Sequence, residues 1–221
     1  MRLAHAAMAL GMGVSGLSVS ADALAHPHGW IDLSVRVITD DQGAASGLYQ
    51  TWRMDPFYSL VVFEELQQVE GASLEQGLDQ LGKEIRDNLS SEHYLTEVSI
   101  NGEQQALGEV SEYTAMERDG RLVFMFILPL ETPQSLTDSI LTYQVFDPTY
   151  YIEVVHEADD NQPTDEALIL EGELSCELSI LPANPDPELV MQAALLDKGE
   201  SGESGLGRYF AETGSVDCTG R

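Results

Sequence analysis

Two histidines near the N-terminus, His26 and His28, are the residues of this sequence best suited to bind a metal ion. If the chain is cleaved before His26, the α-amine and the imidazole of that residue can chelate one ion, and a second imidazole follows two residues later. Nitrogen ligands of this kind suit Ni, Co, Cu or Zn rather than Ca or Mg. Pro27 excludes the square-planar N-terminal copper or nickel motif, because that motif needs an amide N–H at position two. The alternative is that both histidines merely lead into the first strand.

Secondary candidates for metal ligation lie farther along the chain. His156 ends the run 150–155 and could approach the N-terminus if the two strands are neighbours, although a structural histidine is the alternative. Asp147 precedes a proline and is typical of an Asx or type I turn, and its carboxylate could also supply an oxygen ligand. His93 is a weaker candidate.

The first 25 residues have the features of an export signal. Arg2 precedes an apolar stretch at 6–17, and a small-residue cleavage pattern ends at Ala25, so the mature chain would begin at His26. A rival pattern at 21–23 would instead leave Leu24 at the N-terminus and separate the α-amine from His26. No later apolar run reaches the roughly 20 residues that span a bilayer. We therefore expect a protein that is soluble after export.

The charge of the chain restricts its partners. There are 38 acidic residues against 10 basic ones, which gives a formal net charge of −28. Residues 1–25 contain one basic and one acidic residue, so their removal leaves this charge unchanged. Such a charge repels nucleic acid. It is typical of a surface adapted to high salt, and a field that attracts cations to a metal site is the alternative.

The chain contains two cysteines, Cys176 and Cys218. An even pair in an oxidising compartment, without C-x-x-C spacing, predicts a structural disulfide rather than thiol exchange or a zinc site. The sequence has no G-x-S-x-G, H-E-x-x-H, phosphate-loop or dinucleotide motif. We therefore expect a protein that is not an enzyme.

Hydrophobic periodicity predicts the elements that must position these residues. Period-two patterns and turn signals indicate short strands at 30–38, 48–54, 138–146, 150–156 and 167–181, with hairpin turns at Asn101-Gly102 and Asp119-Gly120. Apolar spacings of three or four residues and capping residues predict helices at 56–66, at 74–89 and from Pro187 to about Lys198. The run Leu60 to Phe63 could instead be a buried strand. The pattern predicts a mostly β (α+β) fold: one domain at 26–221 forming a β-sandwich, with a helical insertion at about 56–89 and a C-terminal helix.

Several motifs together resemble the DUF1007 family, and the resemblance runs across essentially the whole mature chain. They are His26-Pro27-His28, Trp30-Ile31-Asp32, Phe146-Asp147-Pro148-Thr149-Tyr150-Tyr151, Cys176, Gly207-Arg208-Tyr209-Phe210-Ala211-Glu212 and Cys218. The resemblance marks these positions without saying which of them are ligands; besides the histidines and cysteines, they include Trp30, Asp32, Asp147, Tyr150 and Tyr151.

Members of this family are exported bacterial proteins labelled as periplasmic components of ABC-type transport systems, and their genes often lie beside nickel/cobalt-type permeases. The resemblance therefore implies a periplasmic role in metal handling. Many relatives carry a loop like the calcium-binding EF loop, but here the stretch 67–73 keeps only Glu70 as a carboxylate, so calcium is not expected there.

These observations predict a periplasmic accessory protein that binds a Ni, Co, Zn or Cu ion at its mature N-terminus and serves an inner-membrane metal permease. One alternative is a copper-dependent oxidative enzyme that uses the N-terminal histidine chelate. The other is a transporter adaptor without a metal, in which the histidines are structural.

Overall fold

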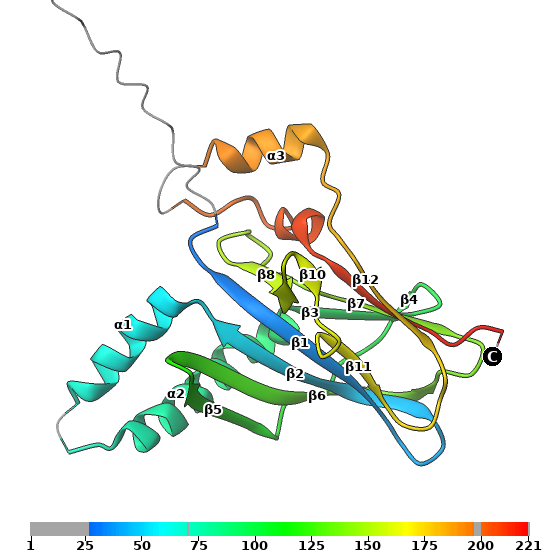
Figure 1. Ribbon diagram of the computed structural model, residues 1–221, viewed down its shortest axis with the longest axis horizontal. Coiled ribbons are helices and arrows are strands. Elements are labelled where there is room, and N and C mark those ends of the chain that lie inside the picture. The colour runs from blue at the N-terminus through cyan, green and yellow to red at the C-terminus, as the bar shows by residue number, and fades with distance from the viewer. Residues whose placement is uncertain (1–26, 70, 197–199, 221) are drawn as a thin grey trace, which may run out of the picture.

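Two β-sheets pack into a β-sandwich in the computed structural model, which describes residues 27–69, 71–196 and 200–220 (Figure 1). The six-stranded first sheet has the order β11-β1-β2-β6-β5, with β8 also paired to β1. Its strands are β1 (Trp30–Thr39), β2 (Ala44–Met54), β5 (Tyr113–Arg118), β6 (Arg121–Ser135), β8 (Glu153–His156) and β11 (Leu168–Glu171).

The five-stranded second sheet has the order β12-β13-β7-β3-β4. Its strands are β3 (Thr96–Ile100), β4 (Glu103–Gln104), β7 (Ile140–Val145), β12 (Glu177–Leu181) and β13 (Thr213–Asp217). A separate small ribbon pairs β9 (Ala158–Asp159) with β10 (Gln162–Pro163). The predicted mostly β sandwich is thus confirmed.

Strand β1 organises the first sheet. Its alternating apolar side chains, Ile31, Leu33, Val35 and Val37, are all buried in the core between the sheets. One edge of β1 pairs with β2, and its other edge pairs in parallel first with β8 and then with β11. The N-terminal strand and the strand of His156 are therefore neighbours, which was the condition for His156 to approach the N-terminus.

The predicted helices form, and the strand alternative at Leu60 to Phe63 is wrong. Helix α1 (Pro56–Gln67) begins after Asp55, whose carboxylate accepts two backbone N–H groups, and helix α2 (Leu74–Leu89) begins with a capping box at Ser73. Both lie at one end of the first sheet, where α1 contacts β6 and α2 contacts β5 (Figure 1). Helix α3 (Pro187–Ala194) ends earlier than the predicted Lys198, which lies outside the described residues.

The single strand predicted at 167–181 is wrong, because this stretch forms two strands in different sheets. Gly172, between β11 and β12, has a φ of +145°, a value that residues with a side chain rarely adopt. The strand predicted at 150–156 begins only at Glu153, because a turn occupies the preceding residues. Strand β13 and the short helix η2 (Gly207–Phe210) were not predicted.

The predicted disulfide is present. Cys176 precedes β12 and Cys218 follows β13, and the bond ties together the two strands that the register pairs from Glu177 to Leu181. The C-terminal strand is thereby held in the second sheet.

Candidate functional site

His28, one of the two predicted N-terminal metal ligands, lies just ahead of β1. Its backbone N–H donates to the carbonyl of Tyr151 at 2.9 Å, and the centroids of the two rings are 4.3 Å apart. The residue is exposed, and β1 begins two residues later at Trp30. His26 and the predicted signal segment 1–25 lie outside the described residues.

Asp147 forms the turn that supports Tyr151. One carboxylate oxygen accepts the backbone N–H and the hydroxyl of Thr149, and the other accepts the N–H groups of Tyr151 and Ile152. Tyr150 has a φ of +56° in this turn and stacks on Phe210 with ring centroids 4.1 Å apart. The carboxylate therefore orders the backbone on which His28 rests.

His156 is buried and engages both ring nitrogens. Nδ1 lies 2.8 Å from a carboxylate oxygen of Glu212, and Nε2 lies 2.7 Å from the Tyr143 hydroxyl. The same Glu212 oxygen also accepts the backbone N–H of His156. The carboxylate places the proton on Nδ1, so Nε2 accepts the hydroxyl hydrogen of Tyr143.

His28 and His156 are not brought together. His156 pairs with Leu33 in the parallel register, and the five residue steps from His28 to Leu33 span about 16 Å of extended chain. His156 instead joins Glu212 and Tyr143. Glu212 was missed as a site residue, although it lies in the motif 207–212 that carries part of the family resemblance.

The charges around His156 are coupled. Burial alone would raise the pKa of Glu212, but the hydrogen bonds that its carboxylate accepts from the His156 ring and backbone hold this pKa below its usual value. Burial, followed by the charge of Glu212, raises the pKa of Glu153. Burial also raises the pKa of Tyr143, so its hydroxyl stays protonated and can donate to His156.

The motif residues Trp30 and Asp32 have contacts within the sandwich. Asp32 pairs with Arg121, whose guanidinium also donates to the carbonyls of Arg53 and Met54. The carbonyl of Trp30 accepts the N–H of Asp55, the residue that caps α1, while the Trp30 side chain is half exposed. These contacts join β1 to β2, to β6 and to the helical insertion.

Within the described part of the chain, no three His, Cys, Asp or Glu side chains converge as a metal site. A metal site at the N-terminus would therefore combine His28 with His26 and the α-amine, both outside the described residues. Nitrogen donors of this kind fit Ni, Co, Cu or Zn.

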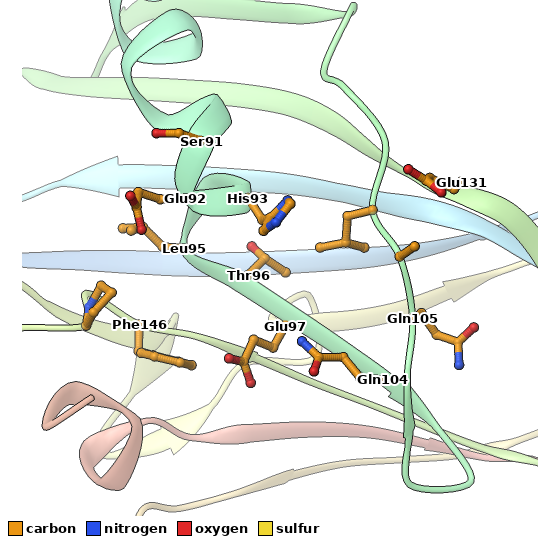
Figure 2. A pocket seen from close by; sticks show the side chains of 13 residues that line it. Ser91, Glu92, His93, Leu95, Thr96, Glu97, Gln104, Gln105, Glu131 and Phe146 are labelled. Atoms are coloured by element: carbon orange, nitrogen blue, oxygen red, sulfur yellow. The ribbon is translucent and has the colours of Figure 1, made fainter. Parts of the chain in front are cut away.

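A cleft of about 530 Å³ opens beside the start of β3 (Figure 2). One wall is the 3-10 segment η1 (Ser90–Leu95) with the start of β3, and the other is the segment 104–107. This segment crosses between the sheets, because Gln105 donates to Val98 in β3 and Glu131 in β6 donates to Ala106. The lining residues are Ser91, Glu92, His93, Leu95, Thr96, Glu97, Gln104, Gln105, Ala106, Leu107, Glu131, Phe146 and Pro148.

Three consecutive residues beside the cleft, His93, Tyr94 and Leu95, have left-handed backbone angles, with φ between 48° and 56°. This conformation costs a residue with a side chain about 1–2 kcal/mol. A buried network stabilises it: the Thr96 hydroxyl donates to the Tyr94 carbonyl, and the amide of Gln50 donates to that hydroxyl. The turn presents the exposed His93 at the cleft (Figure 2).

The geometry defines a disulfide-closed β-sandwich domain with a helical insertion and a buried Glu–His–Tyr network, and none of the described helices is long and apolar enough to cross a membrane. The chain belongs to the DUF1007 family, a family of unknown function, whose model matches residues 12–218. It is also similar to an uncharacterized protein of Haemophilus influenzae (strain Rd). The two are 28% identical over 207 residues, which cover 92% of this chain and 96% of the relative.

Proposed function

We propose that this protein is a periplasmic metal-handling accessory that binds a Ni, Co, Zn or Cu ion through His26, His28 and the mature α-amine, and that serves an inner-membrane metal permease. The observation that carries the proposal is the position of His28. It is exposed, it lies two residues before β1, and its backbone is hydrogen-bonded to Tyr151. Cleavage after Ala25 would place the chain terminus two residues from this fixed point.

The surroundings of His28 favour a binding site that is ordered on one side. The Asp147 turn fixes Tyr151, and Tyr151 contacts both the backbone and the ring of His28. Because this segment is already ordered by the protein, less conformational entropy is lost when an ion binds. The net charge of −28 also raises the local concentration of cations around the molecule.

The ion is cargo in this proposal, and the role of the chain is to bind it and present it to the permease. Ligation needs a neutral amine and neutral imidazoles, groups that take up protons between about pH 8 and pH 6. Metal affinity should therefore fall as the pH drops through this range. His156 is not part of the proposed site, because both of its ring nitrogens are engaged with Glu212 and Tyr143.

The test is a calorimetric titration of the mature protein with Ni²⁺, Co²⁺, Zn²⁺ and Cu²⁺, beside variants that alter single donors. An alanine added before His26 separates the α-amine from the imidazole, and His28→Ala removes the second imidazole. Both changes should weaken binding. His93→Asn is the matched control, since it removes an exposed histidine elsewhere and asparagine tolerates the left-handed backbone of that position.

Equal affinities in the native, extended and His28→Ala proteins would refute an N-terminal site. Reductant-dependent oxygen consumption by the copper-loaded protein would favour the oxidative enzyme over the accessory role. If none of the four ions binds, the remaining hypothesis is a transporter adaptor without a metal.

A further inference from the structure

We propose that strand β12 (Glu177–Leu181) pairs with β12 of a second copy of this chain, so that the second sheets of two molecules join into one continuous sheet. The strand is an end strand of its sheet, and within the described part of the chain it pairs with β13 alone. The proposal does not depend on metal binding, because no residue of the predicted metal site lies in β12.

The main-chain groups of Leu178 and Ile180 point to the side of β12 that faces away from β13. The Cα atoms of Cys176 and Cys218 are 4.4 Å apart, which is the spacing of a non-hydrogen-bonded antiparallel pair. The N–H of Cys218 accordingly donates to the carbonyl of Ser139, on the side of β7. Because the two kinds of pair alternate along the strands, Leu178 and Ile180 continue the pattern of Cys176. Their N–H and C=O groups are therefore directed toward a further strand.

The side chains of the same two residues face the core but remain partly uncovered. Leu178 lies opposite Val216, which is fully buried between the sheets, so the two side chains share the core face. Leu178 is nevertheless 38% exposed. A groove of about 300 Å³ runs beside Leu178 and Ile180 and reaches Leu168 of β11 in the first sheet. The inward side chains of one more strand would cover this edge of the core.

Strand β12 lacks the features that usually protect an edge strand from pairing. Such strands commonly contain a proline, a lysine, an inward-pointing charge or a bulge. The sequence of β12 has neither proline nor lysine, its inward side chains are apolar, and its register with β13 has no shift. Other edges differ, because β5 contacts α2 and β4 is only two residues long. The edge of β12 is thus suited to accept another strand.

The sequence of β12 is complementary to itself in a two-fold antiparallel register centred on Ser179. In this register Leu178 lies opposite Ile180 of the second copy, and the reverse pair is equivalent. Each of these pairs exchanges two N–H···O=C bonds, because both residues direct their main-chain groups outward. At the centre Ser179 meets itself in a non-hydrogen-bonded pair, where the close approach suits a small hydroxyl side chain. Glu177 lies opposite Leu181, so no like charges face each other directly. This self-complementarity favours a second copy over an unrelated segment.

The net charge sets the conditions for pairing. Each copy has a charge of −28, so two copies repel each other when the screening length is long. The screening length falls from ~8 Å at about 0.15 M ionic strength to ~3 Å at about 1 M. A pair of short strands also buries less area than the roughly 1,600 Å² of a standard interface. We therefore expect a weak, reversible dimer whose Kd decreases as the salt concentration rises.

The experiment measures the mass of the full mature protein by sedimentation velocity at about 0.15 M and about 1 M NaCl, over a range of protein concentrations. We expect a concentration-dependent dimer with the lower Kd at the higher salt concentration. Ile180→Pro should abolish it, because proline removes the outward N–H and is tolerated on an edge strand where that N–H faces solvent. Ser179→Glu places like charges opposite each other and should raise the Kd about twofold to fivefold. Ser111→Glu adds the same charge at an exposed residue ahead of β5 and is the matched control.

Cross-linking tests the register itself. Ser179→Cys places two thiols at the centre of the pair, where the Cα atoms are about 4.5 Å apart, and should give disulfide-linked dimers on oxidation. Leu181→Cys is the matched control, since it is exposed on the same strand. In the proposed register its counterpart lies four residues away, about 13 Å along the strand, so it should not cross-link. Mass spectrometry of the peptides identifies the linked residues and checks the Cys176–Cys218 bond.

A protein that remains monomeric at both salt concentrations would overturn the proposal, and an extended segment of another protein would then be the candidate for this edge. Equal cross-linking of the Ser179→Cys and Leu181→Cys proteins would also overturn it. So would a dimer that persists undiminished in Ile180→Pro and Ser179→Glu, because the copies would then meet elsewhere, for example through the exposed Phe57 of α1. Circular dichroism checks the fold of each variant, and if Ile180→Pro does not fold, the Ser179 variants decide.

Discussion

Replacing Tyr143 by phenylalanine tests the buried network that joins the two sheets. The hydroxyl of Tyr143, in β7 of the second sheet, lies 2.7 Å from Nε2 of His156, in β8 of the first sheet. Tyr143 and His156 are 1% and 4% exposed, so water cannot replace a lost partner. The substitution keeps the ring and removes only the hydrogen bond.

The expected loss follows from the unsatisfied nitrogen that remains. Because Glu212 fixes the proton on Nδ1, Nε2 has a lone pair without a donor once the hydroxyl is gone. Leaving one buried polar group unsatisfied costs about 1–3 kcal/mol of unfolding free energy. For a chain of this size, 1 kcal/mol corresponds to about 2–4 °C in melting temperature, so we expect a decrease of about 2–12 °C.

Urea denaturation followed by circular dichroism measures this loss as a lower midpoint at an unchanged slope. Tyr209→Phe is the control, since Tyr209 is 55% exposed and its variant should stay within about 0.5 kcal/mol of the native protein. In a His156→Gln background, Tyr143→Phe should cost less than in the native background, because the two residues share one hydrogen bond. A Tyr143→Phe protein as stable as the control would refute the structural role of this network.

Three features of the same region and one of the whole surface give further predictions. Gly214→Ala should lower the free energy of unfolding by about 1–3 kcal/mol in the same denaturation assay, because a Cβ would overlap the Tyr143 ring. Stability should fall as the pH drops below about 4.3 and through the depressed pKa of Glu212, and Glu212→Gln should flatten that part of the pH profile; identical profiles would contradict the coupling. Reduction of the Cys176–Cys218 bond, confirmed by mass spectrometry of alkylated thiols, should lower stability by about 4 kcal/mol for a separation of 42 residues. The melting temperature should rise between about 0.01 M and 1 M NaCl, because the screening length falls from ~30 Å to ~3 Å around a charge of −28, and a flat profile would count against adaptation to salt.

The sequence pattern predicted those strands and helices whose formation depends mainly on neighbouring residues. The alternation in β1 and the capping box of α2 gave nearly the observed bounds, because burial period and caps act over a few residues. Strand β13 could not be predicted in this way, because Val216 is the one apolar side chain in Thr213–Asp217 and the strand forms through pairing with β7 and β12. The division at Gly172 likewise depends on which sheet each half of the stretch joins.

The candidate site residues show the same difference between local and distant contacts. Asp147 was predicted as a turn residue because an Asx turn is formed by an aspartate and the backbone of the residues that directly follow it. The hydrogen bond between His156 and Glu212 joins residues 56 positions apart, so no local sequence pattern predicts it. His93 was a weak candidate because nothing in its neighbours reveals the left-handed backbone that places it at a cleft. Such a backbone is held by distant core residues, namely Gln50 and Trp52.

The position of His28 depends on contacts made by distant parts of the chain. The parallel pairing of β8 with β1 places Tyr151, just before β8, next to His28, just before β1. Asp147 accepts the backbone N–H of Tyr151 and so fixes the turn that contains it. Strand β8 is in turn anchored through the His156 backbone and ring to Glu212, which directly precedes the strand closed by the disulfide. Loosening the C-terminal segment should therefore disturb the N-terminal segment, although the two are about 180 residues apart. This linkage gives a physical reason for the family resemblance to include motifs at both ends of the chain.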